Sequence, residues 1–281
     1  MLEEEIILPG HRACPGCGGA IAERLILNTL GRNTILFGEG VCASACTRNV
    51  TIPSMTLHFS GVVAGATGII SALEAKGKTD ITVASFNGDG ATSDIGFAKL
   101  SAGAERNDNL IHFCLDNEAY MNTGIQKSHL TPYKAWTTTT PWGKTTPKKN
   151  LPLLMAYHFI PYVATVSVAY PKDFISKVEK AKKIKGFKYI HVLCPCPTGW
   201  RFSAEKTIEV ARLAVQTRVW PLYEVENGKL TITVKPKKRS VKDYLAIQGR
   251  FRHLTEEDIQ QIERHVDKEW ERLERLEQTG I

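Results

Sequence analysis

A strand, a glycine turn and a helix follow one another in the middle of this chain, and this stretch constrains the fold more than any other. Residues 81–86 form a β-branched and apolar run that leads into Gly88-Asp89-Gly90. A helical pattern then extends over residues 92–107. A buried strand that passes through a tight turn into a helix is the first half of a parallel β-α-β unit. The stretch therefore predicts an α/β fold.

The next apolar run brings Asn117 to the same edge of the predicted sheet. Residues 110–115 read as the neighbouring parallel strand, and Asn117 follows almost directly. Open parallel sheets bind ligands in the crevice outside the carboxyl ends of their strands. The glycines let the backbone approach a phosphate, and the following helix N-terminus attracts an anion. Since Asp89 and Asn117 add hard oxygen ligands, we expect a magnesium diphosphate site here.

Strands and helices continue to alternate along most of the chain. Further strands are expected at residues 34–38, 162–168 and 188–193, and helices at residues 61–76, 151–158, 171–184 and 203–216. Another helix is expected to open at the turn of residues 14–19 and to stop at Gly31. This alternation is typical of a doubly wound, mostly parallel sheet.

Two parts of the chain depart from this alternation. Residues 121–150 have no regular pattern, and a connection this long could cover a cofactor, contact another subunit or be a plain surface loop. An Asn-Gly turn at the centre of residues 222–234 predicts a β-hairpin, and an amphipathic helix begins after Thr255. We therefore expect a ligand-binding domain over residues 1–220 and a C-terminal extension for subunit packing over residues 221–281.

Composition and charge argue against several classes of protein. No apolar run approaches the roughly 20 residues of a membrane span, and the first five residues are acidic where a signal peptide would be basic. We therefore expect a cytoplasmic protein without a membrane partner. The net charge of +7 is modest, and residues 235–239, the one dense basic run, carry no recognition motif for nucleic acid. This run suits a solvated hairpin end or an acidic partner.

The cysteines are placed like metal ligands. Seven cysteines are an odd number, so a disulfide framework is not expected. Cys14 and Cys17 form a Cys-x-x-Cys pair, Cys42 follows 25 positions later, and Cys194 and Cys196 lie in a proline-rich turn after a strand. Four thiolates in such turns suit tetrahedral zinc or a [4Fe-4S] cluster, and spacing alone leaves both open.

These motifs resemble a known family. Gly-Asp-Gly, 26 intervening residues and then Asn117 resemble the diphosphate signature of thiamine diphosphate enzymes. Residues 117–124 resemble the matching segment of the 2-oxoacid:ferredoxin oxidoreductases, above all the beta subunits of their pyruvate-oxidising members. The resemblance implies a thiamine diphosphate-binding fold that carries the diphosphate half of the site.

The resemblance also implies a role for each residue of the site. The expected magnesium ligands are Asp89, Asn117 and the carbonyl of Ala119. The expected contacts to thiamine diphosphate come from Gly88, Asp89, Gly90, Ala91, Asn117, Ala119, Tyr120, Asn122 and Cys42. Asn122 is the candidate catalytic residue, because it is expected to contact the substrate or its intermediate.

The same resemblance favours a [4Fe-4S] cluster over zinc. Its implied ligands are Cys14, Cys17, Cys42 and Cys196, with Cys194 as the alternative for the fourth position. The remaining two, Cys46 and Cys114, are expected to be structural thiols. Some relatives carry an acidic residue where this chain has Gly19, so a cofactor contact from that position is absent here.

The implied reaction needs partners. Members of the family convert pyruvate, coenzyme A and oxidised ferredoxin reversibly to acetyl-CoA, CO₂ and reduced ferredoxin. No glutamate here is evidently placed to assist the pyrimidine ring of the cofactor, so an alpha subunit is expected to supply that half-site, and gamma and ferredoxin-like delta subunits to carry electrons. Branched-chain 2-oxoacids, 2-oxoglutarate and oxalate stay open as substrates. A non-redox thiamine enzyme and a zinc-stabilised scaffold subunit are two further hypotheses for the function.

Overall fold

One eight-stranded sheet forms the centre of the molecule in the computed structural model, which describes residues 5–40, 42, 45 and 49–281. Within this part of the chain the strand order is β2-β1-β3-β4-β6-β5-β7-β8. The first six strands run parallel, and β7 and β8 are antiparallel to their neighbours. Their bounds are β1 Thr34–Glu39, β2 Ser54–Leu57, β3 Thr82–Gly88, β4 Leu110–Asp116, β5 Tyr162–Ser167, β6 Lys188–Leu193, β7 Leu222–Glu226 and β8 Lys229–Val234.

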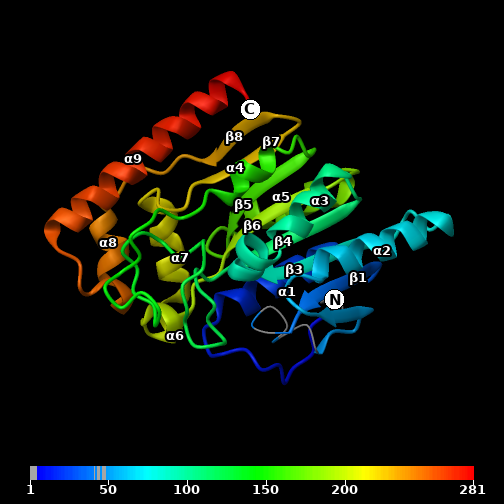
Figure 1. Ribbon diagram of the computed structural model, residues 1–281, viewed down its shortest axis with the longest axis horizontal. Helices are drawn as coiled ribbons and strands as arrows, with labels where there is room; N and C mark the ends of the chain where they lie inside the picture. The colour runs from blue at the N-terminus through cyan, green and yellow to red at the C-terminus, as the bar shows by residue number, and fades with distance from the viewer. Residues whose placement is uncertain (1–4, 41, 43–44, 46–48) are drawn as a thin grey trace.

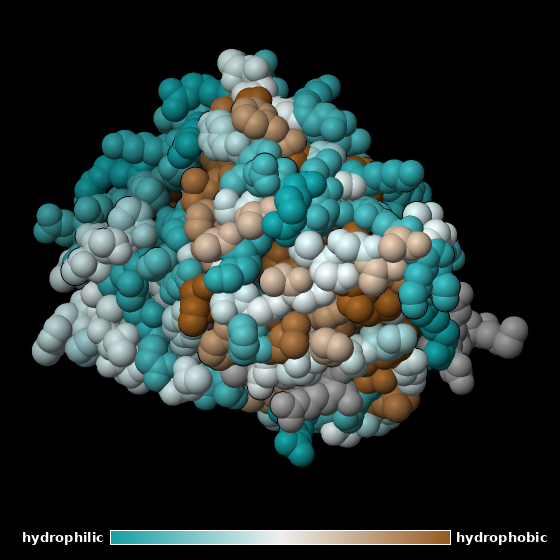
Figure 2. Space-filling view, turned by 45° about the vertical axis from the view of Figure 1, so that its right-hand side comes forward, coloured by the Kyte–Doolittle hydropathy of each residue, from teal (hydrophilic) through white to brown (hydrophobic). Residues whose placement is uncertain are grey.

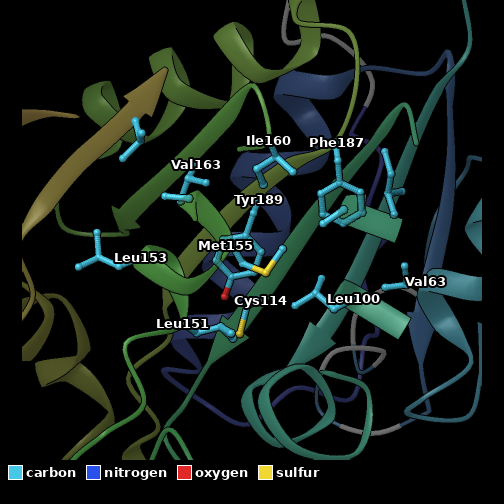
Figure 3. Packing of buried hydrophobic residues seen from close by; sticks show 14 of the residues in the cluster. Val63, Leu100, Cys114, Leu151, Leu153, Met155, Ile160, Val163, Phe187 and Tyr189 are labelled. Carbon is cyan, nitrogen blue, oxygen red and sulfur yellow. The ribbon is translucent and has the colours of Figure 1, made fainter. Parts of the chain in front are cut away.

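Helices cover both faces of the sheet (Figure 1). On one face α1 (Gly18–Leu30) and α5 (Pro171–Lys183) pack against strand residues such as Phe86 and Phe113. On the other face, α2, α3, α4 and α9 pack against the alternate strand residues, such as Cys114 and Tyr189 (Figure 3). The remaining bounds are α2 Val62–Ala75, η3 Ala91–Ile95, α3 Phe97–Glu105, α4 Leu151–Ala156, α6 Pro197–Trp200, η4 Ala204–Lys206, α7 Thr207–Gln216, α8 Val241–Ala246, η5 Gly249–Phe251 and α9 Glu256–Thr279.

The expected α/β architecture with a doubly wound, mostly parallel sheet is confirmed. Successive strand residues point to opposite faces, and both sets are apolar because helices bury both faces. The strands expected at residues 34–38, 110–115, 162–168 and 188–193 are all present within a residue or so of their expected ends. In the described chain no helix is both long and apolar enough to cross a membrane.

The helix expected over residues 92–107 begins differently. Its first turn, η3, is a wide π-helix, and regular α-helix starts only at Phe97. The hydroxyl of Thr92 donates a hydrogen bond of 2.8 Å to the Gly88 carbonyl, so a side chain competes for a backbone acceptor where the helix starts. Such π-helical turns are rare, and they occur often at functional sites.

Three short elements differ from the sequence-based expectation. Strand β2 and helices α6 and α8 were not expected, because four to six residues are too few to display a clear period. Strand β2 is also mostly exposed, so it lacks the apolar run of a buried parallel strand.

The C-terminal hairpin extends the main sheet. Its strand β7 pairs antiparallel with β5, and its turn residues Asn227 and Gly228 both adopt positive φ angles, at 49° and 79°. The amphipathic helix expected after Thr255 is present as α9, and it begins with a capping box: the Thr255 hydroxyl accepts from the Asp258 backbone, and the Asp258 carboxylate accepts from the Thr255 backbone. A division at residue 220, with residues 221–281 used for subunit packing, stays a prediction.

Candidate active site

The carboxyl ends of β1, β3, β4 and β6 meet around one pocket. It encloses about 70 Å³. Its walls include every residue that the sequence suggested for cofactor or metal binding: Cys14, Cys17, Cys42, Gly88, Asp89, Gly90, Ala91, Asn117, Ala119, Tyr120, Asn122 and Cys196, together with the alternative ligand Cys194. Segments from opposite ends of the predicted ligand-binding domain are therefore neighbours at one sheet edge.

Two neighbours explain the Gly-Asp-Gly turn. A Cβ atom added at Gly90 would lie 2.2 Å from the ring of Tyr120, so only glycine lets the ring pack there. The Gly88 amide donates a hydrogen bond of 3.0 Å to the Glu39 carboxylate. Because Glu39 holds Gly88 and Tyr120 packs against Gly90, the backbone position of Asp89 between them is fixed.

Asp89 is a buried carboxylate without an ion pair among the described residues. Only 2% of its surface is exposed, and the hydroxyl of Ser128 donates to it. Burial, together with the negative charge of Asp116, raises the pKa of Asp89 well above its ordinary value. A cation beside this carboxylate would reverse that effect and keep it ionised.

Three oxygens lie close together here, one of them from this carboxylate. The Asn117 side-chain oxygen, in its assigned orientation, lies 3.1 Å from Asp89 Oδ1 and 2.7 Å from the Ala119 carbonyl oxygen. With the amide turned over, its nitrogen would instead donate to both atoms. A bound hard cation would select the orientation in which the Asn117 oxygen faces the other two oxygens, and in that orientation these three residues fit Mg²⁺.

The segment that carries Asn117 is fixed by a buried group of ions. The Lys148 ammonium lies 2.7 Å from a carboxylate oxygen of Asp116 and 2.7 Å from one of Glu118. Arg250 pairs with the second oxygen of Glu118 at 2.6 Å, and His191 bonds to Asp116 at 2.8 Å. Two acids and two cations thereby balance one another on either side of Asn117.

This ion group also settles the protonation states. Burial alone raises the pKa of Asp116, but the charge of Lys148 and the hydrogen bond from His191 outweigh it, so the pKa lies below its ordinary value. Burial lowers the pKa of Lys148, but the negative charges of Asp116 and Glu118 raise it by more. The net shift is upward, so Lys148 stays charged. The pKa of His191 is lowered by burial, so its ring is neutral.

The backbone next to Asn117 is held in an uncommon conformation. Glu118 has a φ of +68°, in the left-handed region that non-glycine residues rarely adopt. The Asn117 carbonyl accepts from the indole of Trp200 at 2.7 Å, and the Glu118 carbonyl accepts from Thr131 at 2.7 Å. Such strain persists only where the surroundings enforce it, and it occurs often at functional sites.

The four expected cluster ligands surround the same pocket but do not form a closed metal site. Among the residues that the structure describes, no three Cys, His, Asp or Glu side chains are grouped to hold a metal ion. Burial raises the pKa of Cys42 to about 12, and the charges of Cys196, Cys17 and Cys14 add to this effect. The four thiols are thus mutual electrostatic neighbours, and their donor set suits a cluster whose irons would stabilise the thiolates.

The Cys14–Cys17 turn reaches the Pro195–Cys196 turn through the backbone. The Gly18 amide donates to the Pro195 carbonyl at 3.0 Å, and a Cβ atom at Gly18 would lie 2.7 Å from the Pro195 ring. Cys196 is partly exposed, whereas Cys194 is 2% exposed and belongs to the apolar core. This difference supports Cys196 as the fourth ligand.

The two structural thiols and Asn122 are the remaining residues singled out by the sequence. Cys114 is fully buried against the helices of one face, as expected of a structural thiol, while Cys46 lies outside the described residues. Asn122 is exposed at the pocket rim, in the turn that follows Tyr120. Its assignment as the catalytic residue stays a prediction.

Glu39 is a pocket residue that the sequence analysis missed. It ends β1, is 2% exposed, and lines the pocket beside Gly88. Burial raises its pKa to about 7, against the weaker opposing effect of hydrogen bonds from Gly88 and Asn87. Its position directly after the expected strand 34–38, like that of Asp89 after its strand, was the signal available in the sequence.

Glu39 should make the stability of the chain depend on pH. The folded chain keeps the Glu39 proton up to about pH 7, whereas the unfolded chain releases it near pH 4.5. The free energy of unfolding should therefore fall by roughly 3 kcal/mol from pH 4.5 to 7 relative to a Glu39→Gln variant. Urea unfolding across this range measures it, with Glu105→Gln, at an exposed position, as the control. Parallel profiles for wild type and Glu39→Gln would contradict the assignment.

Comparison with known proteins agrees with this geometry. A family model described as thiamine pyrophosphate enzyme, C-terminal TPP binding domain, matches residues 43–192. A solved structure of 2-oxoglutarate:ferredoxin oxidoreductase from Magnetococcus marinus has the same fold, with a TM-score of 0.62 and 23% identity over 75% of this chain and 81% of that one.

Curated relatives match almost the full chain. Pyruvate synthase subunit PorB of Methanothermobacter thermautotrophicus is 49% identical over 276 residues, which cover 94% of this chain and 96% of the relative. Ketoisovalerate oxidoreductase subunit VorB of Pyrococcus abyssi is 44% identical over 291 residues, which cover 97% of this chain and 94% of the relative. The chain therefore belongs to the thiamine pyrophosphate enzymes, as a beta subunit of the 2-oxoacid:ferredoxin oxidoreductase family that includes PorB and VorB.

Proposed function

We propose that this chain is the beta subunit of a pyruvate:ferredoxin oxidoreductase, which converts pyruvate, coenzyme A and oxidised ferredoxin reversibly to acetyl-CoA, CO₂ and reduced ferredoxin. The observation that carries the proposal is the convergence of the Asp89, Asn117 and Ala119 oxygens in a pocket that four cysteines also line. Four PorB relatives, at 45–49% identity, support pyruvate over the branched-chain substrate of the VorB relatives at 43–44%, while a further PorB is 40% identical. A cytoplasmic location is part of the proposal.

Different pocket residues would bind different parts of the cofactor. Thiamine diphosphate supplies a carbon nucleophile that adds to the carbonyl of a 2-oxoacid and accepts the electrons left by decarboxylation. Asp89, Asn117 and the Ala119 carbonyl would hold Mg²⁺. The backbone of Gly88, Gly90 and Ala91 would hold the phosphates, with Tyr120 beside them, and Asn122 at the rim would contact the substrate.

The cysteines would bind the cluster that accepts electrons from the cofactor. Cys14, Cys17, Cys42 and Cys196 come from three separate segments around one pocket, and together they supply the four thiolates that a [4Fe-4S] cluster needs. Cys42 extends from the β1 end beside Glu39, so it would lie between the cluster and the cofactor. Electrons would then pass to gamma and ferredoxin-like delta subunits and to ferredoxin.

A second subunit is needed to complete the site. The pocket of about 70 Å³ is far smaller than the roughly 300–1,000 Å³ of typical cofactor sites. Large apolar side chains are also exposed, among them Ile95 at the end of η3 and Met55 on the edge strand β2. Figure 2 shows hydrophobic residues that reach the surface on one face of the molecule. We propose that an alpha subunit covers this edge and supplies the pyrimidine half-site.

Reconstitution with iron and sulfide tests the cluster. The chain, purified anaerobically, should bind about four irons and absorb near ~400 nm, and dithionite should bleach that absorbance. Cys42→Ser should lose the iron, whereas Cys114→Ala should keep it, because Cys114 is fully buried in the core and does not line the pocket. A colourless chain that retains zinc would instead indicate a scaffold subunit, and a colourless chain that still binds thiamine diphosphate would indicate a non-redox enzyme.

Asp89→Asn tests the magnesium site separately. The change removes the one carboxylate of the proposed ligand set, so Mn²⁺, as a paramagnetic substitute, should bind at least about 100-fold more weakly in the presence of thiamine diphosphate. Electron paramagnetic resonance of free Mn²⁺ measures the affinity. Asp80→Asn, at an exposed position near the opposite end of β3 from Asp89, is the matched control and should bind normally. Equal affinity in Asp89→Asn and wild type would rule out this ligand.

Lys148→Met tests whether the buried ions position Asn117. Loss of the ammonium leaves Asp116 and Glu118 without their shared partner, so Mn²⁺ affinity should fall by about 10- to 100-fold, as for other supports of metal ligands. Lys148→Arg should restore most of the affinity because it keeps the charge, and Lys99→Met, at an exposed position, should have no effect. Unchanged Mn²⁺ affinity in Lys148→Met would show that the ion group has no positioning role.

A further inference from the structure

A second and much larger cavity lies beneath helix α9. Its volume is about 690 Å³, within the range of roughly 300–1,000 Å³ that small-molecule sites occupy. Three parts of the fold enclose it: one side of α9, the segment that leads into β7, and residues of the long loop 121–150. Tyr133 of the loop donates to Gln261 of α9 at 3.1 Å, so loop and helix are joined at the rim.

The cavity contains a cation, Arg218, with a buried nitrogen that has no hydrogen-bond partner within the described chain. The Nε atom of Arg218 is buried, and it has no hydrogen-bond partner among the described residues. The guanidinium carbon lies over the Trp270 ring, 4.2 Å from its centre, so the group has an aromatic contact but no acceptor at Nε. Buried donors are almost always paired in folded proteins, so the unpaired Nε of Arg218 points to an acceptor from outside the described residues.

The backbone at Arg218 is also unusual. Its φ is +63°, in the left-handed region that favours glycine, yet the residue at this position is an arginine with a long side chain. Strain of this kind is found often where a side chain binds a ligand.

The other charged groups of the cavity already have partners. Lys148 pairs with Asp116 and Glu118, and Arg272 lies 3.9 Å from Glu269. The rest of the wall is mainly apolar and aromatic, and includes Val219, Trp220, Tyr223, Tyr244, Leu245 and Val266. Arg218 is therefore the anchor for one negative charge, within walls that suit an apolar body.

We propose that this cavity binds an organic anion, a carboxylate or phosphate on an apolar body, with the Arg218 guanidinium as its anchor. The free edge of an arginine matches two oxygens of either group through parallel hydrogen bonds. The cavity shares Lys148 with the ion group beside Asn117, so its occupant would lie one side chain away from the active-site segment.

Three probes of one shape test the charge requirement. Isothermal titration calorimetry compares 1-naphthoate, 1-naphthyl phosphate and uncharged 1-naphthalenemethanol, on the full chain and on the enzyme assembled with its partner subunits. At least one anion should bind more tightly than the alcohol, and the two anions distinguish carboxylate from phosphate as the preferred group. An alcohol that binds as tightly as both anions would overturn the proposal.

Arg218→Gly is the decisive variant. Glycine adopts the left-handed backbone without strain, so the fold should be retained, which the melting temperature checks. Anion affinity should fall by about ten- to hundredfold, because one charged hydrogen-bonded anchor is lost. Arg218→Lys keeps the charge without the fork and should give intermediate affinity, and Arg275→Gln, on the exposed side of α9, should match wild type.

Two results would refute the site. One is equal anion affinity in wild type, Arg218→Gly and Arg218→Lys, which would place the anion elsewhere on the chain. The other is binding to the isolated chain that disappears in the assembled enzyme, which would show that a partner subunit fills the cavity. Neither result depends on the proposed magnesium or cluster site.

Discussion

The Lys148 ammonium between Asp116 and Glu118 is the contact on which the active-site edge depends. Strand β4 ends at Asp116, and the chain must turn at once so that Asn117 and the Ala119 carbonyl both face Asp89. That turn places two carboxylates in an apolar interior, where unpaired charges are strongly unfavourable. Lys148 and Arg250 neutralise them, His191 donates a hydrogen bond to Asp116, and the turn can then persist in its strained form.

The same arrangement separates two kinds of carboxylate within one pocket edge. Asp116 is kept ionised by a nearby cation, whereas Asp89, which has no ion pair within the described chain, has a raised pKa. A site of this kind has one fixed anion that supports the backbone and one carboxylate that a divalent cation would bind. The difference comes from the partners of each group and not from their burial, because both are almost fully buried.

The parts that the sequence could predict are those in which local pattern and topology agree. Gly88-Asp89-Gly90 and Asn117 each follow a buried strand, and the carboxyl ends of parallel strands lie at one edge of the sheet. Their proximity could therefore be predicted from the order of strands and motifs along the sequence. Lys148 and Arg250 gave no such signal. Each is a single cation in an irregular segment, and its carboxylate partner lies 30 or 132 positions away. The cavity beneath α9 could not be predicted from the sequence either, because it depends on how α9 packs against the long loop and the segment before β7.

The ion pair between Arg250 and Glu118 also bears on the order in which the protein assembles. The parallel strands β1 to β6 can pair once residue 193 has been made, but Glu118 gains its arginine only when the chain has grown to residue 250. Contacts of such long sequence separation form late, because a large loop must close first. The ion pair that holds Glu118 can therefore form only after nearly the whole polypeptide has been synthesised.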